Sequence, residues 1–177
     1  MKNYIENLNF KINKQSLLRA LRTNLALNDY VFLCVGSDRI TGDCLGPLTG
    51  QLLTRNYNVK AYVYGTLEAP VTAQNLLKTE KFIRKRHKQS KIITIDASLG
   101  SLEEVGRIRM LNSGVFPGSA TNKNLPKVGD FSITATVNTG SQKDPSTLFA
   151  TRLHLVYHLA DTIADAISDY LKERQAN

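Results

Sequence analysis

The sequence predicts an α/β protein, a three-layer sandwich around a five-stranded, mostly parallel sheet with one antiparallel strand. Short apolar runs alternate along the chain with segments of helical periodicity, which is the order typical of parallel sheets covered by helices. Polar, glycine-containing loops separate these segments, and no internal repeat or linker divides the chain. We therefore expect one domain over residues 1–177.

The amino-terminal half is expected to contain two helices and two strands. Leucines spaced along one face predict an amphipathic helix over Lys14–Leu27. The apolar run Tyr30–Val35 predicts a buried strand, and Pro47 suits the first turn of a helix over Leu48–Arg55. The segment Val59–Tyr64 then predicts a second strand, which ends at a glycine.

The carboxyl-terminal half is expected to contain three strands and two helices. Apolar residues at helical spacing predict a helix that leads into the basic run Lys78–Lys91. The apolar run Lys91–Ile95 predicts a core strand, and the short link after it makes Val105–Leu111 an antiparallel edge strand. Asp130–Val137 alternates apolar and polar residues as a fifth strand, and one apolar stripe predicts a long helix over Pro145–Lys172.

The composition excludes several classes of protein. Apolar residues make up 42% of the chain, so global disorder is not expected. The first residues contain no apolar segment typical of a secretory signal, and no apolar run approaches the roughly 18 residues that span a bilayer. The two cysteines form no disulfide framework and suit a reducing compartment. We expect a cytoplasmic protein without a membrane partner.

The net charge of +8 raises the question of an anionic partner. Much of this charge lies in the run Lys78–Lys91, and a basic patch can bind nucleic acid by neutralising phosphates. No aromatic ladder for base stacking is interleaved with these cations, however. We therefore favour a solvated helix end and do not expect a nucleic-acid partner, whereas an acidic protein partner or a homo-oligomer stays open.

The loop Val35–Pro47 is the most informative segment. It joins an apolar strand to a helix, and open α/β sheets bind their ligands at such carboxyl ends of strands. The loop carries Asp43, and the next core strand ends directly in Asp96. Two carboxyls at one sheet edge, within reach of a bridging water, can share a proton and act as general acid and base. The structural alternative is that Asp43 caps the following helix and Asp96 bonds loop amides.

Further polar residues flank the expected cleft. Lys123 could anchor a substrate carboxylate or stabilise an oxyanion, although it fits equally well as a surface lysine. Asp38 is also explained by a turn or by an ion pair with its neighbour. Cys44 follows Asp43, whose charge should raise the thiol pKa and weaken the sulfur as a nucleophile. The candidates for substrate binding are Asp38, Glu68, Asn75, Lys123 and Asn138.

The motif around Asp43 and five further segments form one ordered set of six. They are Val35–Pro47, Gly65–Leu76, Ile95–Ala97, Pro117–Gly118, Leu125–Asp130 and Val137–Asn138. In this order they resemble the YyaC-type sporulation proteins, relatives of the bacterial spore germination protease. The resemblance implies the phosphorylase/hydrolase-like fold that this group shares with hydrogenase maturation endopeptidases.

The resemblance also implies an activity. The germination protease is an unusual aspartic-type protease, and its proposed catalytic carboxylates match Asp43 and Asp96. This chain is accordingly expected to be a sporulation-associated peptidase. It would hydrolyse a peptide bond in a protein or peptide substrate, in the cytoplasm of a spore-forming bacterium.

Two rival functions remain. Hydrogenase maturation endopeptidases hold nickel with acidic residues and a histidine, but no histidine lies in the matching segments, so we expect no bound metal or other cofactor. His154 and His158 share one face of the last helix but lack the intervening glutamate of a metalloprotease helix. Alternatively, a non-catalytic binding module could use the acidic cleft to hold a basic segment.

Overall fold

A computed structural model of the chain describes residues 13–25, 29–116, 127–140 and 145–176. Its strands are β1 (Tyr30–Cys34), β2 (Tyr62–Tyr64), β3 (Lys91–Gly100), β4 (Ile108–Leu111) and β5 (Phe131–Thr139). Its α-helices are α2 (Lys14–Asn24), α3 (Leu45–Gln51), α4 (Leu76–Arg86) and α5 (Leu153–Ala176). Shorter helical turns are η1 (Gly42–Cys44), η2 (Leu52–Asn56), η3 (Leu102–Glu104) and η5 (Pro145–Leu148).

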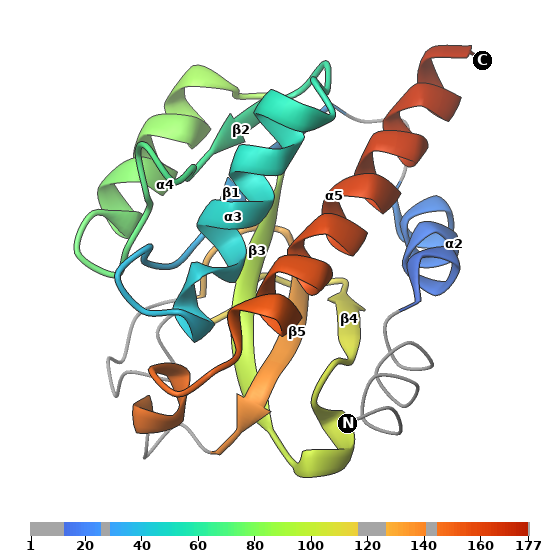
Figure 1. Ribbon diagram of the computed structural model, residues 1–177. Coiled ribbons are helices and arrows are strands. Elements are labelled where there is room, and N and C mark those ends of the chain that lie inside the picture. Colours follow the sequence, from blue (N-terminus) through green and yellow to red (C-terminus); the bar gives the residue numbers. More distant parts are fainter. Residues whose placement is uncertain (1–12, 26–28, 117–126, 141–144, 177) are drawn as a thin grey trace.

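Within the described residues, five strands form one sheet in the order β2-β1-β3-β5-β4. β1 pairs in parallel with β2 and with β3, and β3 pairs in parallel with β5. β4 lies at the edge and runs antiparallel to β5. The predicted mostly parallel sheet with one antiparallel strand is therefore confirmed (Figure 1).

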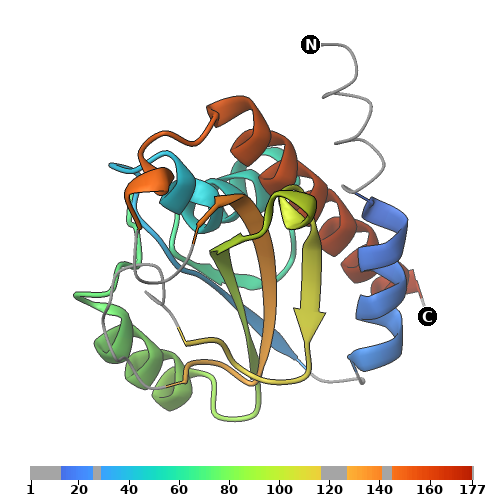
Figure 2. The same cartoon turned by 90° about the horizontal axis from the view of Figure 1, so that it is seen from below.

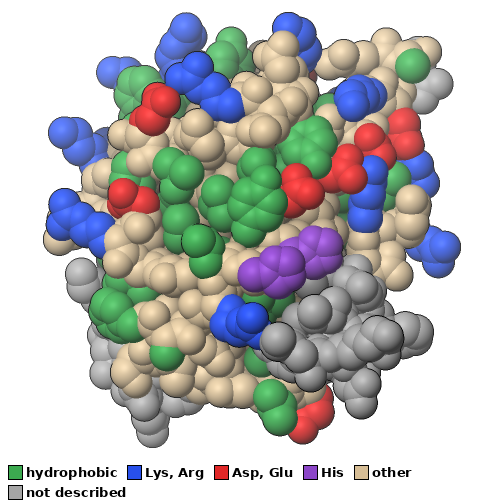
Figure 3. All heavy atoms as spheres, in the orientation of Figure 1, with side chains coloured by type: hydrophobic (Ala, Val, Ile, Leu, Met, Phe, Trp, Pro, Cys, Tyr) green, Lys and Arg blue, Asp and Glu red, His purple; other side chains and the backbone are tan. Residues whose placement is uncertain are grey.

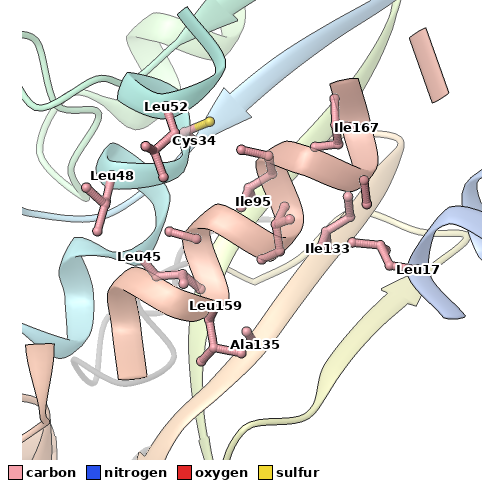
Figure 4. Close-up of a cluster of buried hydrophobic side chains, with 14 of the residues drawn as sticks. Leu17, Cys34, Leu45, Leu48, Leu52, Ile95, Ile133, Ala135, Leu159 and Ile167 are labelled. Atoms are coloured by element: carbon pink, nitrogen blue, oxygen red, sulfur yellow. The ribbon is translucent and has the colours of Figure 1, made fainter. Parts of the chain in front are cut away.

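Helices cover both faces of the sheet, which gives the predicted three layers. α2, α3 and α5 lie on one face and α4 lies on the other, as the view from below shows (Figure 2). The larger apolar cluster fills the first interface, where Leu45 of α3 and Leu159 of α5 pack near Ile95 of β3 (Figure 4). A smaller cluster under α4 contains Leu76 and Ile83. No helix among the described residues is long and apolar enough to cross a membrane.

The strand β3 is longer than expected, and this changes the setting of Asp96. The sequence predicts that the strand ends at Asp96, but pairing with β5 continues as far as Gly100. β1, on the other side of β3, stops at Cys34, which pairs with Ile95. Asp96 is therefore flanked by a strand on one side only, and the loop after β1 occupies the other side.

Glycines allow the loop after β1 to pack tightly against the strand end. A Cβ atom at Gly46 would lie 2.0 Å from the carbonyl oxygen of Val35, so a side chain there would collide with backbone. Gly36 has φ of +141°, and a Cβ there would lie 2.0 Å from the carbonyl oxygen of Asp43. These contacts hold the start of α3 and the backbone of Asp43 against the end of β1.

The last helix begins later than expected. The sequence predicts a helix from Pro145, but the chain forms the short turn η5 and α5 starts at Leu153. The carbonyl oxygen of Thr147 accepts hydrogen bonds from the side chains of Asn138 and Thr151, at 2.9 Å each. Because these side chains engage the carbonyl that a continuing helix would use, the helix is interrupted. Phe149, expected on the apolar stripe, is 66% exposed.

Two strands are shorter than their apolar patterns suggest. Only Tyr62–Tyr64 of the expected strand Val59–Tyr64 pairs with β1, since the amide of Val59 instead bonds the carbonyl of Leu53 at 3.0 Å. The antiparallel strand starts at Ile108, because Gly106 before it has φ of +88°. Both strands lie at an edge of the sheet.

Candidate active site

Asp96 projects from the middle of β3 toward the face of the sheet that α4 covers. Its neighbour Ile95 packs in the cluster on the opposite face, and successive side chains of a strand alternate between faces. Asp96 is only 5% exposed, and its Oδ1 atom accepts a hydrogen bond of 2.9 Å from the amide of Ala97. A carboxyl group with so little access to water is costly to ionise.

Asp43 lies in η1, directly before α3, on the loop that follows β1. The amide of Ser37 donates a hydrogen bond of 3.2 Å to the backbone carbonyl of Asp43. This bond joins the start of the loop to its end. The Asp43 side chain is partly buried. Burial raises its pKa from 3.8 to about 6, and a hydrogen bond from the Ser37 amide partly opposes that rise.

The two carboxyl groups interact with each other. η1 contacts β3, which brings Asp43 to the strand that carries Asp96. Burial raises the pKa of Asp96 well above its usual value, and the charge of Asp43 raises it further, against a smaller opposing effect of the Ala97 amide. Two like charges in a desolvated place disfavour double ionisation, so the pair tends to retain a proton near neutral pH.

Hydroxyl side chains line the same face of the sheet beside Asp96. Thr134 of β5 is the register partner of Asp96, and Thr136 is the partner of Ser98. The hydroxyl groups of Ser98 and Thr136 lie 3.2 Å apart and share a hydrogen bond. The sequence analysis did not assign Ser98, Thr134 or Thr136 to the site. The alternation of apolar and polar residues in Asp130–Val137 could have indicated Thr134 and Thr136, because it places both on the polar face of the strand.

The predicted substrate-binding residues are dispersed. Asp38 is exposed in the turn after β1, and Glu68 is exposed and pairs with Arg55 at 3.1 Å. The side chain of Asn75 bonds its own loop, accepting from the amide of Thr72 at 2.9 Å and donating to the carbonyl of Pro70 at 3.2 Å. Lys123 lies outside the described residues.

The remaining candidate, Asn138, connects β5 to the chain before α5. Its amide nitrogen donates to the carbonyl of Thr147 at 2.9 Å and to the hydroxyl of Thr151 at 3.2 Å, and its Oδ1 accepts from the amide of Thr139 at 2.8 Å. A Cβ atom at Gly42 of η1 would lie 2.8 Å from the Thr151 hydroxyl, so this network abuts the loop that carries Asp43. Asn138 thus helps to position the loop of Asp43 through Thr151, which lies against Gly42.

We expect Asn138→Ala to lower the free energy of unfolding by about 1–3 kcal/mol, because three hydrogen bonds are lost and the amide of Thr139 loses its side-chain acceptor. Urea denaturation followed by circular dichroism measures this change. Asn75→Ala is the matched control, since it removes an amide from an exposed loop. An effect of Asn138→Ala no larger than that of Asn75→Ala would contradict the supporting role.

In the part of the chain that the structure describes, the charged residues near the pair are not arranged as a metal site. Among the described residues, no group of three or more His, Cys, Asp or Glu side chains is placed to hold a metal ion. His154 and His158 stack on α5 with their ring centres 6.3 Å apart, and no third ligand joins them among these residues. Two carboxyls alone do not fit the donor set of a tightly held transition metal.

The cysteine beside Asp43 is a poor nucleophile. Burial raises the pKa of the Cys44 thiol, and the charges of Asp38 and Asp43 raise it further. A protonated thiol attacks carbonyl carbon weakly. The direction agrees with the one predicted from the order of residues in the loop, although burial contributes more to the rise than the charge of Asp43 does.

Comparison with known proteins places the chain in a family. The model of the family described as "Protein of unknown function (DUF1256)" matches residues 1–166. The chain belongs to the DUF1256 family. The protein described as "Uncharacterized protein YyaC" of Bacillus subtilis (strain 168) is 37% identical over 154 residues, covering 87% of this chain and 75% of that protein. The resemblance to YyaC-type proteins is thereby confirmed.

A solved structure shares the fold of this DUF1256 protein. It is the [NiFe] hydrogenase maturation protease HycI from Thermococcus kodakarensis KOD1, with a TM-score of 0.58. The likeness covers 86% of this chain and 99% of HycI at 17% sequence identity. It confirms the fold that the sequence motifs implied.

Proposed function

We propose that this DUF1256 protein is a peptidase that hydrolyses a peptide bond by means of Asp43 and Asp96. The observation that carries the proposal is the convergence of two carboxyls at the end of β1, one buried and one partly buried, with the charge of Asp43 raising the pKa of Asp96. Such a pair can hold one proton and one negative charge in the pH range of the cell. The peptidase-like fold of the HycI neighbour supports the same reaction class.

The reaction uses the two states of the pair together. The ionised carboxyl takes a proton from a water molecule, whose oxygen attacks the carbonyl carbon of the scissile peptide bond. The protonated carboxyl donates its proton to the leaving nitrogen as the carbon–nitrogen bond breaks, which yields a new carboxyl and a new amine. The pair holds this proton jointly, and burial raises the pKa of both carboxyls, that of Asp96 well above its usual value.

The substrate is proposed to be a protein or peptide met in the cytoplasm of a spore-forming bacterium. The support is the likeness to YyaC of Bacillus subtilis and the motifs shared with the germination protease. Both cysteines of the chain are free and buried, which suits a reducing compartment. Glu68 and Lys123 remain candidates for contacts with the substrate, whereas the side chain of Asn75 already bonds its own loop.

A peptidase assay tests the proposal. The purified protein is incubated with small acid-soluble spore proteins and with a peptide library, and new amino termini are identified by mass spectrometry. We expect cleavage at defined bonds that is unchanged by EDTA. Cleavage that requires added nickel or zinc would favour a metal-dependent maturation endopeptidase, and tight binding of basic segments without any cleavage would favour a binding module.

A further inference from the structure

The fold brings aromatic side chains to the basic helix α4. The ring of Tyr62 on β2 packs on the ring of His87, at the end of α4, with the ring centres 4.2 Å apart. The hydroxyl of Tyr64 forms a hydrogen bond of 2.8 Å with Nε2 of His87, and Phe82 meets Tyr64 edge to face. Tyr62 is 58% exposed and Phe82 is 54% exposed, so both rings are accessible.

Cations lie on the same helix as Phe82 and directly after it, and Arg86 interacts with Tyr64 and His87. Salt bridges between α4 and described carboxylates involve only Arg84, which pairs with Glu80 and Asp130. The other cations at this end of α4 are exposed, and burial together with the charge of nearby Arg86 lowers the pKa of His87. Figure 3 shows Lys and Arg side chains along the margin of the molecule where α4 lies in Figure 1. The exposed cations on α4 and directly after it, apart from Arg84, include Lys81, Lys85, Arg86 and Lys88.

A cavity is lined in part by Tyr62. Its volume is about 300 Å³, within the lower range of small-molecule sites. It opens where β1, β2 and β3 begin. Asp43 lies at the opposite end of these strands, after the end of β1. Its lining includes two tyrosines, of which Tyr30 is only 5% exposed and lies under the guanidinium of Arg174, together with two cations and one carboxylate. The residues that provide these groups are Tyr30, Tyr62, Lys60, Arg174 and Asp29.

We propose that this surface binds single-stranded nucleic acid. The cations can neutralise successive phosphates, a base can stack on the exposed ring of Tyr62, and a second base can enter the cavity. Asp29 would repel a phosphate but can accept a hydrogen bond from the amino group of a base. An acidic peptide would use the cations alone and would leave the rings and the cavity unexplained.

From the sequence alone we did not expect a nucleic-acid partner, because no aromatic ladder is interleaved with the basic run Lys78–Lys91. The fold overturns this reason, since β2 supplies Tyr62 and Tyr64 from a distant part of the chain. This surface lies at the amino-terminal ends of the strands and the acidic pair lies at the carboxyl-terminal end of β1, so the proposal does not depend on the proposed peptide hydrolysis.

Fluorescence anisotropy with a labelled thymidine 12-mer and a labelled uridine 12-mer tests the proposal between 50 and 200 mM NaCl. We expect Tyr62→Ala to weaken binding roughly 5- to 100-fold, the loss of one stacked base, and Tyr62→Phe to retain binding. Lys85→Ala combined with Lys88→Ala should reduce the slope of log affinity against log salt by about 1.4.

Matched variants on other surfaces serve as controls. Tyr157 is 49% exposed on α5, and Tyr157→Ala should leave affinity unchanged. Arg19→Ala combined with Arg107→Ala removes the same charge from other exposed positions and should change the slope by less. Equal effects of Tyr62→Ala and Tyr157→Ala, or no binding at 50 mM NaCl, would overturn the proposal. Equal competition by a poly-glutamate peptide of the same charge would instead identify an acidic protein partner.

Discussion

Asp43→Asn and Asp96→Asn should each lower the rate of peptide hydrolysis by about 10²–10⁴-fold while the chain stays folded. Asparagine has nearly the size of aspartate and keeps a carbonyl that can accept the hydrogen bond from Ala97 to position 96. It cannot take a proton from water or donate one as an acid. The loss should appear in kcat, because the lost proton transfer belongs to the transition state and not to substrate binding.

Glu173→Gln is the matched control for these variants. It also replaces a carboxylate by an amide, but Glu173 pairs with Arg22 near the end of α5 and is remote from the pair. Its kcat should equal that of the wild type. Steady-state kinetics on one peptide substrate measures kcat for each variant, and circular dichroism of the same preparations checks that each is folded. Hydrolysis that survives in both aspartate variants would remove the pair from the mechanism.

The positions of the two carboxyls could be predicted because each follows a strong local signal. Asp43 lies in a polar loop after an apolar run, and Asp96 follows the run Lys91–Ile95. What could not be predicted is that β3 continues to Gly100. Serine and glycine are weak strand formers, so this extension depends on pairing with β5, which is distant in the sequence.

The start of α5 illustrates the same limit. Pro145 is a good first residue for a helix, and local propensity alone favours a helix from that point. The side chain of Asn138, which lies on β5, bonds the carbonyl of Thr147 and helps to end the turn. Such a contact between a strand and the turn that follows it has no signature in the periodicity of either segment. The aromatic surface around Tyr62 and His87 was missed for the same reason.

The raised pKa values also predict how stability depends on pH. The pKa of Asp43 is about 6 in the folded protein, above its ordinary value of 3.8, so the folded state binds this proton more tightly than the unfolded state. Stability should therefore fall as the pH rises from about 4 to above 6. One pKa unit corresponds to about 1.4 kcal/mol, so Asp43 should contribute a loss of about 3 kcal/mol. The raised pKa of Asp96 extends the loss to higher pH.

Urea unfolding between pH 5 and pH 8 measures this slope in the wild type and in Asp43→Asn. The variant should be more stable than the wild type at pH 8, and its stability should depend less on pH, since the costly ionisation is absent. Glu173→Gln should keep the wild-type slope in this range, because the hydrogen bond from Arg22 holds the pKa of Glu173 below its ordinary value. Equal slopes in Asp43→Asn and the wild type would mean that Asp43 ionises as readily in the folded chain as in water, which would contradict its raised pKa and leave Asp96 alone to retain a proton.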